Sequence, residues 1–259
     1  MDETKIKELV RARYGGIAKG EQANCCGPAG CCDGADSADV TRMGYSEAEA
    51  QAAPESANLS LGCGNPQAIA AMRPGETVLD LGSGAGFDCF LAARQVGPTG
   101  HVIGVDMTHE MLARARANAA RLGAANVEFR LGEIEHLPVA DATADVIISN
   151  CVINLAPDKA QVFREAFRAL KPGGRLAISD VLNTAEMPAA LQADPDLMCK
   201  CATGAAPAAR IEAWLAATGF VDIRISEKPD SRAMIAAWSP GSHVEDYVVS
   251  GIVEARKPA

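Results

Sequence analysis

Between residues 77 and 181, short apolar runs alternate with longer stretches in which apolar side chains recur every three or four positions. The short runs are typical of buried strands, and the longer stretches are typical of helices that cover a sheet. Strands alternating with helices of ten or more residues predict an α/β fold with a parallel, doubly wound sheet. We expect strands at Thr77–Leu81, His101–Asp106, Val127–Leu131, Ala144–Ser149 and Arg175–Val181, and helices at Phe87–Val96, Glu110–Leu122 and Lys159–Leu170.

The pattern is looser on either side of this core. A helical spacing from Asp2 to Arg13 stops near Gly15-Gly16, and Asn65-Pro66 is typical of a helix start. After Leu182, two alternating stretches are expected to complete an antiparallel edge of a mostly parallel, seven-stranded, Rossmann-like sheet. The expected elements are a helix at Ile211–Thr218 and strands at Val221–Ser226 and Tyr247–Ala255. We divide the chain into an N-terminal segment with a Cys-rich loop (1–60), the Rossmann-like domain (61–185) and a C-terminal region (186–259).

The overall composition argues against several classes of partner. The chain has 259 residues, of which 48% are hydrophobic and 22% charged, a balance typical of globular proteins. The net charge of -9 argues against nucleic-acid binding, which needs clustered Lys and Arg. There is no run of about 18 apolar residues, so we expect no membrane span. The N-terminus lacks the pattern of a signal peptide. A cytoplasmic protein is expected, with a monomer as the default state.

The first strand of the core leads into a turn that predicts a nucleotide-binding site. Gly82, Gly84 and Gly86 form a Gly-x-Gly-x-Gly turn before the first helix, where the backbone passes close to a ligand. Twenty residues later Asp106 ends the second strand, where a carboxylate can accept from both ribose hydroxyls. A dinucleotide fingerprint would have its third glycine at position 87, which is Phe87 here. Together with Asp80, this spacing favours S-adenosylmethionine.

Three further segments are expected to contact this methyl donor. Glu133 and Ile134 follow the third strand, where the Glu133 carboxylate can accept from the adenine amine and the Ile134 N–H can donate to the ring. Asn150 ends the fourth strand and is expected near the methionine moiety. Met107 follows Asp106 and completes the predicted donor site.

Nine cysteines are present, which is unusual for a protein of a reducing compartment unless they bind metals or do redox chemistry. Cys151 follows the fourth strand, where the transferred methyl group should point. Cys63 lies just before the core, and Cys201 lies in a segment that can fold back over the strand end. Cys89, inside the first core helix, is expected to be an apolar filler. Four more cysteines lie at positions 25, 26, 31 and 32, in adjacent pairs that do not match the usual zinc spacing.

The stretch Val146-Ile147-Ile148-Ser149-Asn150-Cys151-Val152-Ile153-Asn154-Leu155 closely resembles the arsenite methyltransferases. Further matches to this family span nearly the whole chain, whereas the nucleotide motifs alone are shared by many class I methyltransferases. The matching stretches are Arg13 to Ala18, Leu61 to Pro66, Gly82 to Asp88, Gly104 to Thr108 and Cys201 to Ala205.

This resemblance implies that Cys63, Cys151 and Cys201 are ligands of trivalent arsenic, which three thiolates hold in a pyramid. The arsenic lone pair would attack the sulfonium methyl group in line, giving mono- and dimethylated species at the expense of a thiol reductant of the glutathione or thioredoxin type. Cys199 lies two residues before Cys201, so the third ligand stays open between them, although the Gly-Ala spacing favours Cys201. The resemblance also implies a redox disulfide between Cys63 and an N-terminal cysteine, for which Cys32 and Cys26 are both candidates.

Two other functions fit parts of the sequence. A methyltransferase of a small organic acceptor, such as a quinone precursor, would use the cysteines only structurally, with Trp214 and Trp238 available to line its pocket. A non-catalytic thiol trap for metalloids would not need the donor site, so the presence of Asp106 and the glycine turn counts against it.

Overall fold

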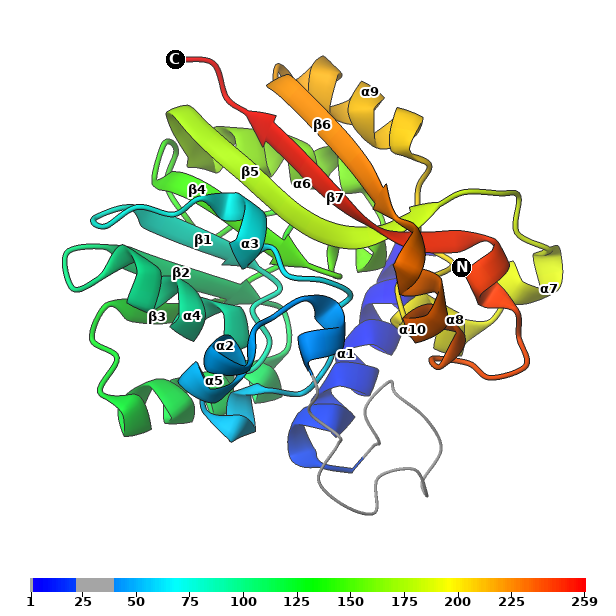
Figure 1. Ribbon diagram of the computed structural model, residues 1–259, viewed down its shortest axis with the longest axis horizontal. Coiled ribbons are helices and arrows are strands. Elements are labelled where there is room, and N and C mark those ends of the chain that lie inside the picture. Colours follow the sequence, from blue (N-terminus) through cyan, green and yellow to red (C-terminus); the bar gives the residue numbers. More distant parts are fainter. Residues whose placement is uncertain (1, 22–39) are drawn as a thin grey trace.

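The computed structural model of the chain describes residues 2–21 and 40–259. These residues form a seven-stranded sheet with the order β3-β2-β1-β4-β5-β7-β6. Neighbouring strands from β3 to β5 are parallel, whereas β7 runs antiparallel to both β5 and β6 (Figure 1). The predicted fold class is therefore confirmed. The strands are β1 (Thr77–Leu81), β2 (His101–Asp106), β3 (Val127–Leu131), β4 (Ala144–Asn150), β5 (Leu170–Asn183), β6 (Val221–Lys228) and β7 (Val248–Arg256).

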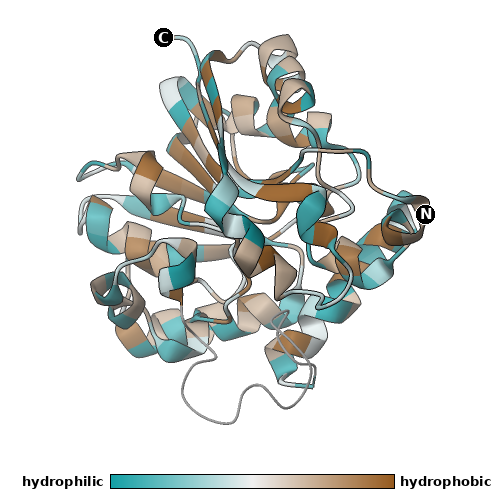
Figure 2. Cartoon of the chain, turned by 45° about the vertical axis from the view of Figure 1, so that its right-hand side comes forward, coloured by the Kyte–Doolittle hydropathy of each residue, from teal (hydrophilic) through white to brown (hydrophobic). Residues whose placement is uncertain are grey.

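Helices cover both faces of the sheet. The described helices are α1 (Glu3–Lys19), α2 (Glu47–Ala52), α3 (Gln67–Ala70), α4 (Phe87–Val96), α5 (His109–Leu122), α6 (Lys159–Ala169), α7 (Ala189–Gln192), α8 (Pro195–Cys199), α9 (Ala208–Thr218) and α10 (Arg232–Ala236). Side chains of a strand alternate between faces, so Leu79 packs with α6 and α9 on one face. Val78 packs with α3, α4 and α5 on the other face. The strands are accordingly the most hydrophobic part of the cartoon, and the outer helices are more polar (Figure 2).

The first helix is longer than the sequence pattern indicated. The expected stop near Gly15-Gly16 is wrong, because α1 continues to Lys19. Both glycines are buried, and a side chain at Gly15 would meet only the flexible carboxylate of Glu110 on α5. The helix instead ends at Gly20, whose positive φ of 74° lets its N–H donate to the carbonyl groups of Gly16 and Ile17. Packing against α5 therefore outweighs the low helix propensity of the two glycines.

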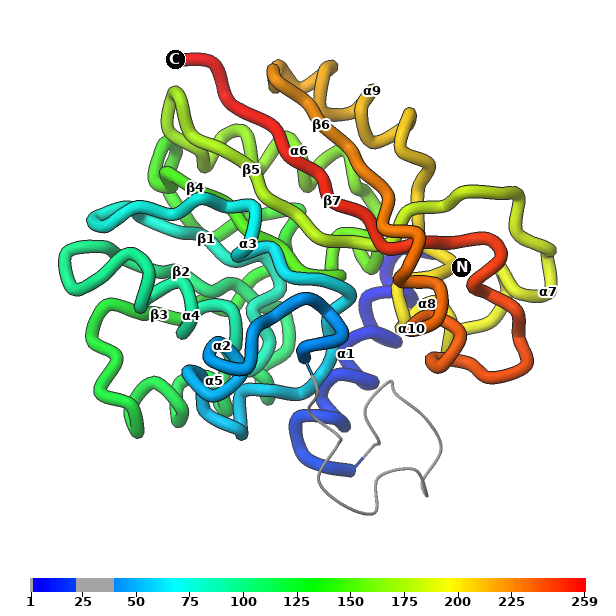
Figure 3. Tube along the Cα trace, viewed as in Figure 1, coloured from blue at the N-terminus to red at the C-terminus, as the bar shows by residue number. Residues whose placement is uncertain are grey.

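A third apolar cluster lies beyond the carboxyl ends of the central strands. Helices α1, α8 and α10 meet there, although their sequence positions are widely separated (Figure 3). Val10 of α1, Leu197 of α8 and Ile235 of α10 belong to this cluster, together with Cys63 and Cys151. The N-terminal helix thus covers the end of the sheet where ligands of doubly wound folds bind. Among the described residues, no helix is long and apolar enough to span a membrane.

Candidate functional site

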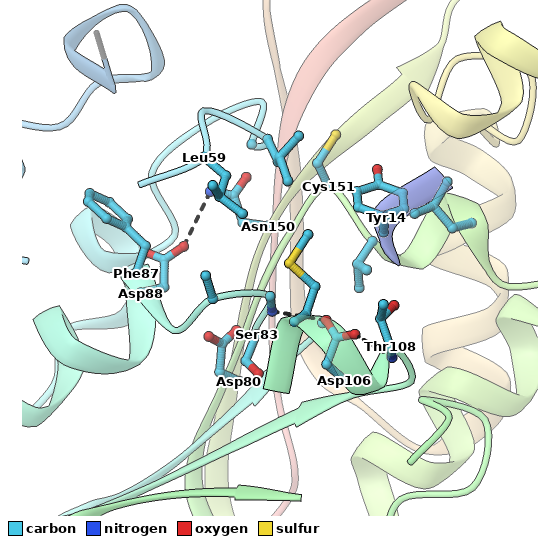
Figure 4. Close-up of a pocket in the computed structure, with 18 of the residues that line it drawn as sticks. Tyr14, Leu59, Asp80, Ser83, Phe87, Asp88, Asp106, Thr108, Asn150 and Cys151 are labelled. Carbon is cyan, nitrogen blue, oxygen red and sulfur yellow. Dashed lines mark hydrogen bonds between the residues drawn. The ribbon is translucent and has the colours of Figure 1, made fainter. Parts of the chain in front are cut away.

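A cavity opens at the carboxyl ends of β1, β2 and β4. Asp80 and Asp106 lie at one end of the cavity, and Asn150 and Cys151 lie at the other (Figure 4). Tyr14 of α1 closes one side of it. Seven of the residues expected around a methyl donor line this cavity, namely Asp80, Gly82, Gly84, Asp106, Met107, Ile134 and Asn150.

The glycine turn brings the backbone to the floor of the cavity. Gly82 and Gly84 have φ angles of 75° and 52°, a left-handed conformation that strongly favours glycine. The N–H of Gly84 donates to Asp106 Oδ2 (2.9 Å), which fixes the carboxylate against the turn. Gly86 does not line the cavity. A Cβ at Gly86 would lie 2.8 Å from ring atoms of both Phe90 and Phe129. Gly86 is thus required for packing behind the turn.

Two polar side chains that can bind a ligand, Asp106 and Ser83, line the cavity. Asp106 Oδ1 also accepts from the N–H of Thr108 (2.8 Å), while burial raises the pKa of its carboxyl group. Ser83 Oγ is buried and has no hydrogen-bond partner among the described residues. A buried hydroxyl without a partner is costly, so a ligand with polar groups fits this place. Ser83 stands between the glycines of the turn, which is the sequence signal that would have pointed to it.

The two glutamates that follow β3, Glu133 and Glu135, have different surroundings. Glu133 does not line the cavity; its carboxylate pairs with Lys7 Nζ (2.6 Å) and with Arg11 of α1. Glu135 does line it, with only 5% of its surface exposed, and its Oε1 lies 3.2 Å from Lys7 Nζ. Hydrogen bonding to Lys7 lowers the pKa of Glu133. The geometry therefore favours Glu135 for contact with a ligand, and Glu133 for fastening α1 over it.

Two buried carboxylates lie behind the glycine turn. Asp80 receives a hydrogen bond from the Cys89 thiol (3.1 Å), and Asp88 receives hydrogen bonds from the Tyr45 hydroxyl (2.7 Å) and Gln67 Nε2 (3.1 Å). Burial raises the pKa of both carboxyl groups, and for Asp80 the charge of Asp88 adds to the effect. A cationic ligand in the cavity would offset this cost. Cys89 is fully buried, as expected, but it also donates to Asp80.

Asn150 links the cavity to the loop that carries Cys63. Its Oδ1 accepts from the N–H of Cys63 (3.0 Å), and its Nδ2 donates to the carbonyl of Gly64 (2.8 Å) and to the Tyr45 hydroxyl (3.0 Å). A longer contact of 3.4 Å reaches Asp88 Oδ2. Asn150 lines the cavity, yet both of its polar atoms are used to fasten this loop.

The Cys63 loop is fitted closely between neighbouring side chains. A Cβ at Gly62 would lie 2.6 Å from Asn150 Nδ2, and one at Gly64 would lie 1.9 Å from Ser179 Oγ. The Cys63 carbonyl accepts from the Ser250 hydroxyl (2.7 Å). Since the Cys63 N–H is also bonded, the backbone of this residue is held on both sides.

Three cysteines from distant parts of the chain meet beside the cavity. The thiols of Cys63 and Cys151 lie within 4.8 Å of each other. The Cys201 thiol donates to the carbonyl oxygen of Cys151 (2.8 Å), and all three side chains belong to one buried cluster. Hydrogen bonds with Cys201 and Cys63, together with burial, raise the pKa of the Cys151 thiol well above its usual range. None of these cysteines forms a disulfide with another described residue.

Two of these cysteines have an unusual backbone. Cys151 and Cys201 have φ angles of 58° and 63°, in the left-handed region that non-glycine residues rarely adopt. Such conformations cost about 1–3 kcal/mol each and tend to occur at functional sites. Cys199 is also buried and lines a small pocket together with Cys151 and Cys201, but it is not part of the apolar cluster that contains the three thiols.

Asp180 is a buried carboxylate that the sequence analysis did not single out. One of its oxygens lies within 4.8 Å of the thiols of both Cys63 and Cys151. Burial raises the pKa of Asp180 to about 6, although several backbone hydrogen bonds and the charge of Lys159 act in the opposite direction. Asp180 therefore adds a buried carboxylate beside the two thiols.

Comparisons with known proteins agree with this geometry. Residues 72–230 match the family model of the methyltransferase domain. Over its full length the chain is 51% identical to the arsenite methyltransferase of Halobacterium salinarum, of which it covers 68%. The chain belongs to the arsenite methyltransferase family. This membership confirms the resemblance predicted from the motif around Cys151.

Other arsenite methyltransferases match smaller shares of the chain. That of Aquipseudomonas alcaligenes is 47% identical over 68% of this chain and 53% of its own length. Among solved structures, an arsenic(III) S-adenosylmethionine methyltransferase from Chlamydomonas reinhardtii has a TM-score of 0.64 at 32% identity, with coverage of 87% of this chain and 75% of that one. The chain thus spans about two thirds of the length of the Halobacterium salinarum protein and about half of the length of the Aquipseudomonas alcaligenes protein.

One part of the predicted site lies outside the described residues. Cys26 and Cys32, the candidates for a redox disulfide with Cys63, fall in residues 22–39. Their pairing stays a prediction of the family resemblance.

Proposed function

We propose that this protein transfers methyl groups from S-adenosylmethionine to trivalent arsenic bound by Cys63, Cys151 and Cys201, and so forms methylated arsenicals. The observation that carries the proposal is the meeting of Cys63 and Cys201, from two separate segments, with Cys151, which lines the cavity proposed for the methyl donor. Soft thiolate ligands are those that trivalent arsenic prefers. An organic acceptor would not need such a cluster.

The residues that line the cavity offer hydrogen-bonding groups that suit each part of the donor. Asp106 would hold the ribose, Ile134 and Glu135 the adenine, and the Ser83 hydroxyl is available to a further polar group. Asp80 would favour the positive charge of the donor. When bound, S-adenosylmethionine supplies an electrophilic methyl group on a sulfonium centre.

The thiols would bind arsenic without any separate base. Arsenite carries three hydroxyl groups, and each can leave as water with a thiol proton as an As–S bond forms. This exchange suits cysteines such as Cys151, whose raised pKa keeps the thiol protonated before arsenic arrives. The attacking lone pair of arsenic carries no proton, so methyl transfer depends on proximity and orientation. Cys151 follows the last residue of β4, Asn150, and would place arsenic next to the donor.

Two finer points belong to the same proposal. Cys201 is favoured over Cys199 as third ligand, because its thiol contacts the Cys151 carbonyl. Methylation raises the formal oxidation state of arsenic, so a thiol reductant of the glutathione or thioredoxin type must return it to the trivalent state before the next transfer.

The test is a turnover assay with arsenite, thiols and S-adenosylmethionine, in which products are separated by their number of methyl groups. We expect Cys63→Ser, Cys151→Ser and Cys201→Ser to lose methylated arsenic, whereas the control Cys199→Ser keeps it. Loss of activity in Cys199→Ser but not in Cys201→Ser would reverse the assignment of the third ligand.

The same assay separates the other functions. A thiol trap would bind arsenite without forming S-adenosylhomocysteine. Normal methyl transfer to an organic acceptor by all three cysteine variants, with no transfer to arsenite by the wild type, would refute the proposal.

A further inference from the structure

A negative charge lies directly beside the thiol cluster. Asp180 lies in the buried part of β5, and one of its carboxylate oxygens lies within 4.8 Å of the sulfur atoms of Cys63 and Cys151. An arsenic atom bonded to both sulfurs would have this carboxylate as a direct neighbour. Only 5% of the Asp180 surface is exposed, so little solvent screens its charge.

The carboxylate is held in place by four N–H donors. Oδ2 accepts from the backbone N–H groups of Ile153 (2.9 Å) and Asn154 (3.2 Å). Oδ1 accepts from Asn154 Nδ2 (2.9 Å) and from the N–H of Val181 (2.7 Å). These bonds stabilise the ionised form and occupy the lone pairs of both oxygens. Asp180 is therefore poorly suited to ligate arsenic itself, but it presents a fixed negative charge to the site.

Lys159 is the cation whose charge acts on Asp180, and its charge also acts on Cys201. The Lys159 Nζ donates to the Ala156 carbonyl (2.9 Å), and among the described residues it forms no ion pair with Asp180 within 4.0 Å. Among the described carboxylates, Asp180 is the one that groups with the sulfur atoms of Cys63 and Cys151.

Charge moves toward Asp180 during the proposed reaction. Trivalent arsenic bound to three thiolates is neutral. During transfer its lone pair becomes the new As–C bond, and the electron pair of the broken C–S bond stays on the donor sulfur. The donor leaves as a neutral thioether, and the positive charge that was on sulfur is now on arsenic. Arsenic is thereby oxidised by two electrons and the methyl sulfonium is reduced, so no other reactant is needed for this step.

We infer that Asp180 accelerates methyl transfer by stabilising the positive charge that develops on arsenic. The interaction strengthens only as the charge arrives, which is the condition for lowering a barrier rather than tightening ground-state binding. A fixed charge in a dry site needs no reorganisation at the moment of reaction. This inference rests on the proposed function and assigns Asp180 an electrostatic role in it.

The experiment compares Asp180→Asn with Asp180→Glu and with the matched control Asn154→Ser. Asn154→Ser keeps the carboxylate but removes one of the bonds that stabilise its ionised form, so all variants are assayed at about pH 8.5, where the carboxylate stays charged. Each variant is checked for cooperative thermal unfolding. Arsenite affinity is measured from the fluorescence of Trp238, which packs in the same cluster as the thiols, with S-adenosylhomocysteine present. Methyl transfer is measured in a single turnover at saturating arsenite and S-adenosylmethionine.

We expect Asp180→Asn to slow transfer by about 10- to 100-fold, below the about 100- to 1000-fold cost of losing one oxyanion-hole donor, because Asp180 acts on arsenic through space and not through a hydrogen bond. Its arsenite affinity should stay within about threefold of wild type, since the bound arsenic is neutral. Asn154→Ser should transfer at close to the wild-type rate, and Asp180→Glu should recover part of the loss.

Three outcomes would count against the inference. A normal transfer rate in Asp180→Asn would overturn the inference about Asp180 and leave the proposed function in place. Equal slowing by Asn154→Ser would show that the hydrogen-bond network, not the charge, matters. If the wild type binds arsenite but transfers no methyl group, the proposed function falls and this inference falls with it.

Discussion

Replacement of Gly62 by Ala tests whether the position of the Cys63 thiol depends on close packing around its loop. A Cβ at this position would lie 2.6, 2.8 and 2.9 Å from the three amide atoms of Asn150, all below the 3.4 Å of an ordinary contact. Asn150 cannot simply turn away, because its amide bonds the N–H of Cys63, the carbonyl of Gly64 and the Tyr45 hydroxyl. The loop must therefore move by about 0.8 Å, and the bond to the Cys63 N–H is the first to break.

The magnitude follows from the usual cost of overpacking. An extra methyl group in a well-packed place costs about 1–3 kcal/mol. If the variant protein relieves this strain by moving the loop, most of the cost reappears when arsenite requires the original position of Cys63. Arsenite binding should then weaken by about 5- to 150-fold, since 1.4 kcal/mol corresponds to a factor of about ten. Donor affinity should change much less, because Gly62 lies at the thiol end of the cavity.

The assay is an arsenite titration followed by Trp238 fluorescence, with calorimetric titration of S-adenosylhomocysteine for the donor site. Gly15→Ala is the matched control, since its new Cβ would meet only the end of the Glu110 side chain and Ala favours the helix. Wild-type arsenite affinity in Gly62→Ala would refute the argument, and so would equal weakening in Gly15→Ala.

Three other substitutions give further tests. Asp80→Asn should stabilise the ligand-free protein at neutral pH, because burial and the charge of Asp88 raise the pKa of the Asp80 carboxyl group. Because folding raises the pKa of Asp80, this group favours folding fully below its unfolded pKa of 3.8 and loses that effect as the pH rises. The stability gain of Asp80→Asn in urea unfolding should therefore vanish below about pH 3.8. The donor affinity of Asp80→Asn should fall at neutral pH. Lys7→Met should raise the donor KM several-fold by freeing α1 from Glu133 and Glu135, with Lys5→Met as the unaffected control. Cys201→Gly should melt higher than Cys201→Ala, because only glycine adopts the φ of 63° without strain; the reverse order would contradict the strained backbone.

Much of the fold could be predicted from local patterns. The bounds of β1, β2, β3 and α4 agree with the sequence prediction, because buried strands and amphipathic helices leave periodic signals. The length of α1 could not be predicted in this way. Its continuation through Gly15-Gly16 depends on packing against α5, a tertiary contact that overrides helix propensity.

The site was predictable where residues stand at strand ends. Asp106 and Asn150 line the cavity because parallel strands bring their carboxyl ends to one edge. The roles of Glu133 and Glu135 could not be separated, since the choice depends on Lys7, 126 residues away from Glu133. Asp180 shows no motif, and its relation to Cys63 and Cys151 appears only when β5 pairs beside β4.

The thiol site and the donor site carry several features that lower the stability of the ligand-free protein. Cys151 and Cys201 adopt left-handed backbone conformations, and Asp80 and Asp180 are carboxylates whose burial raises their pKa. Each feature opposes folding at neutral pH, yet each is a group that the proposed reaction uses. The cationic donor would relieve the cost at Asp80, and arsenic would tie the two strained cysteines together. Binding of both ligands should therefore stabilise the fold in two ways, by adding contacts and by relieving these costs. This is the expected behaviour of a site whose geometry is set before its ligands arrive.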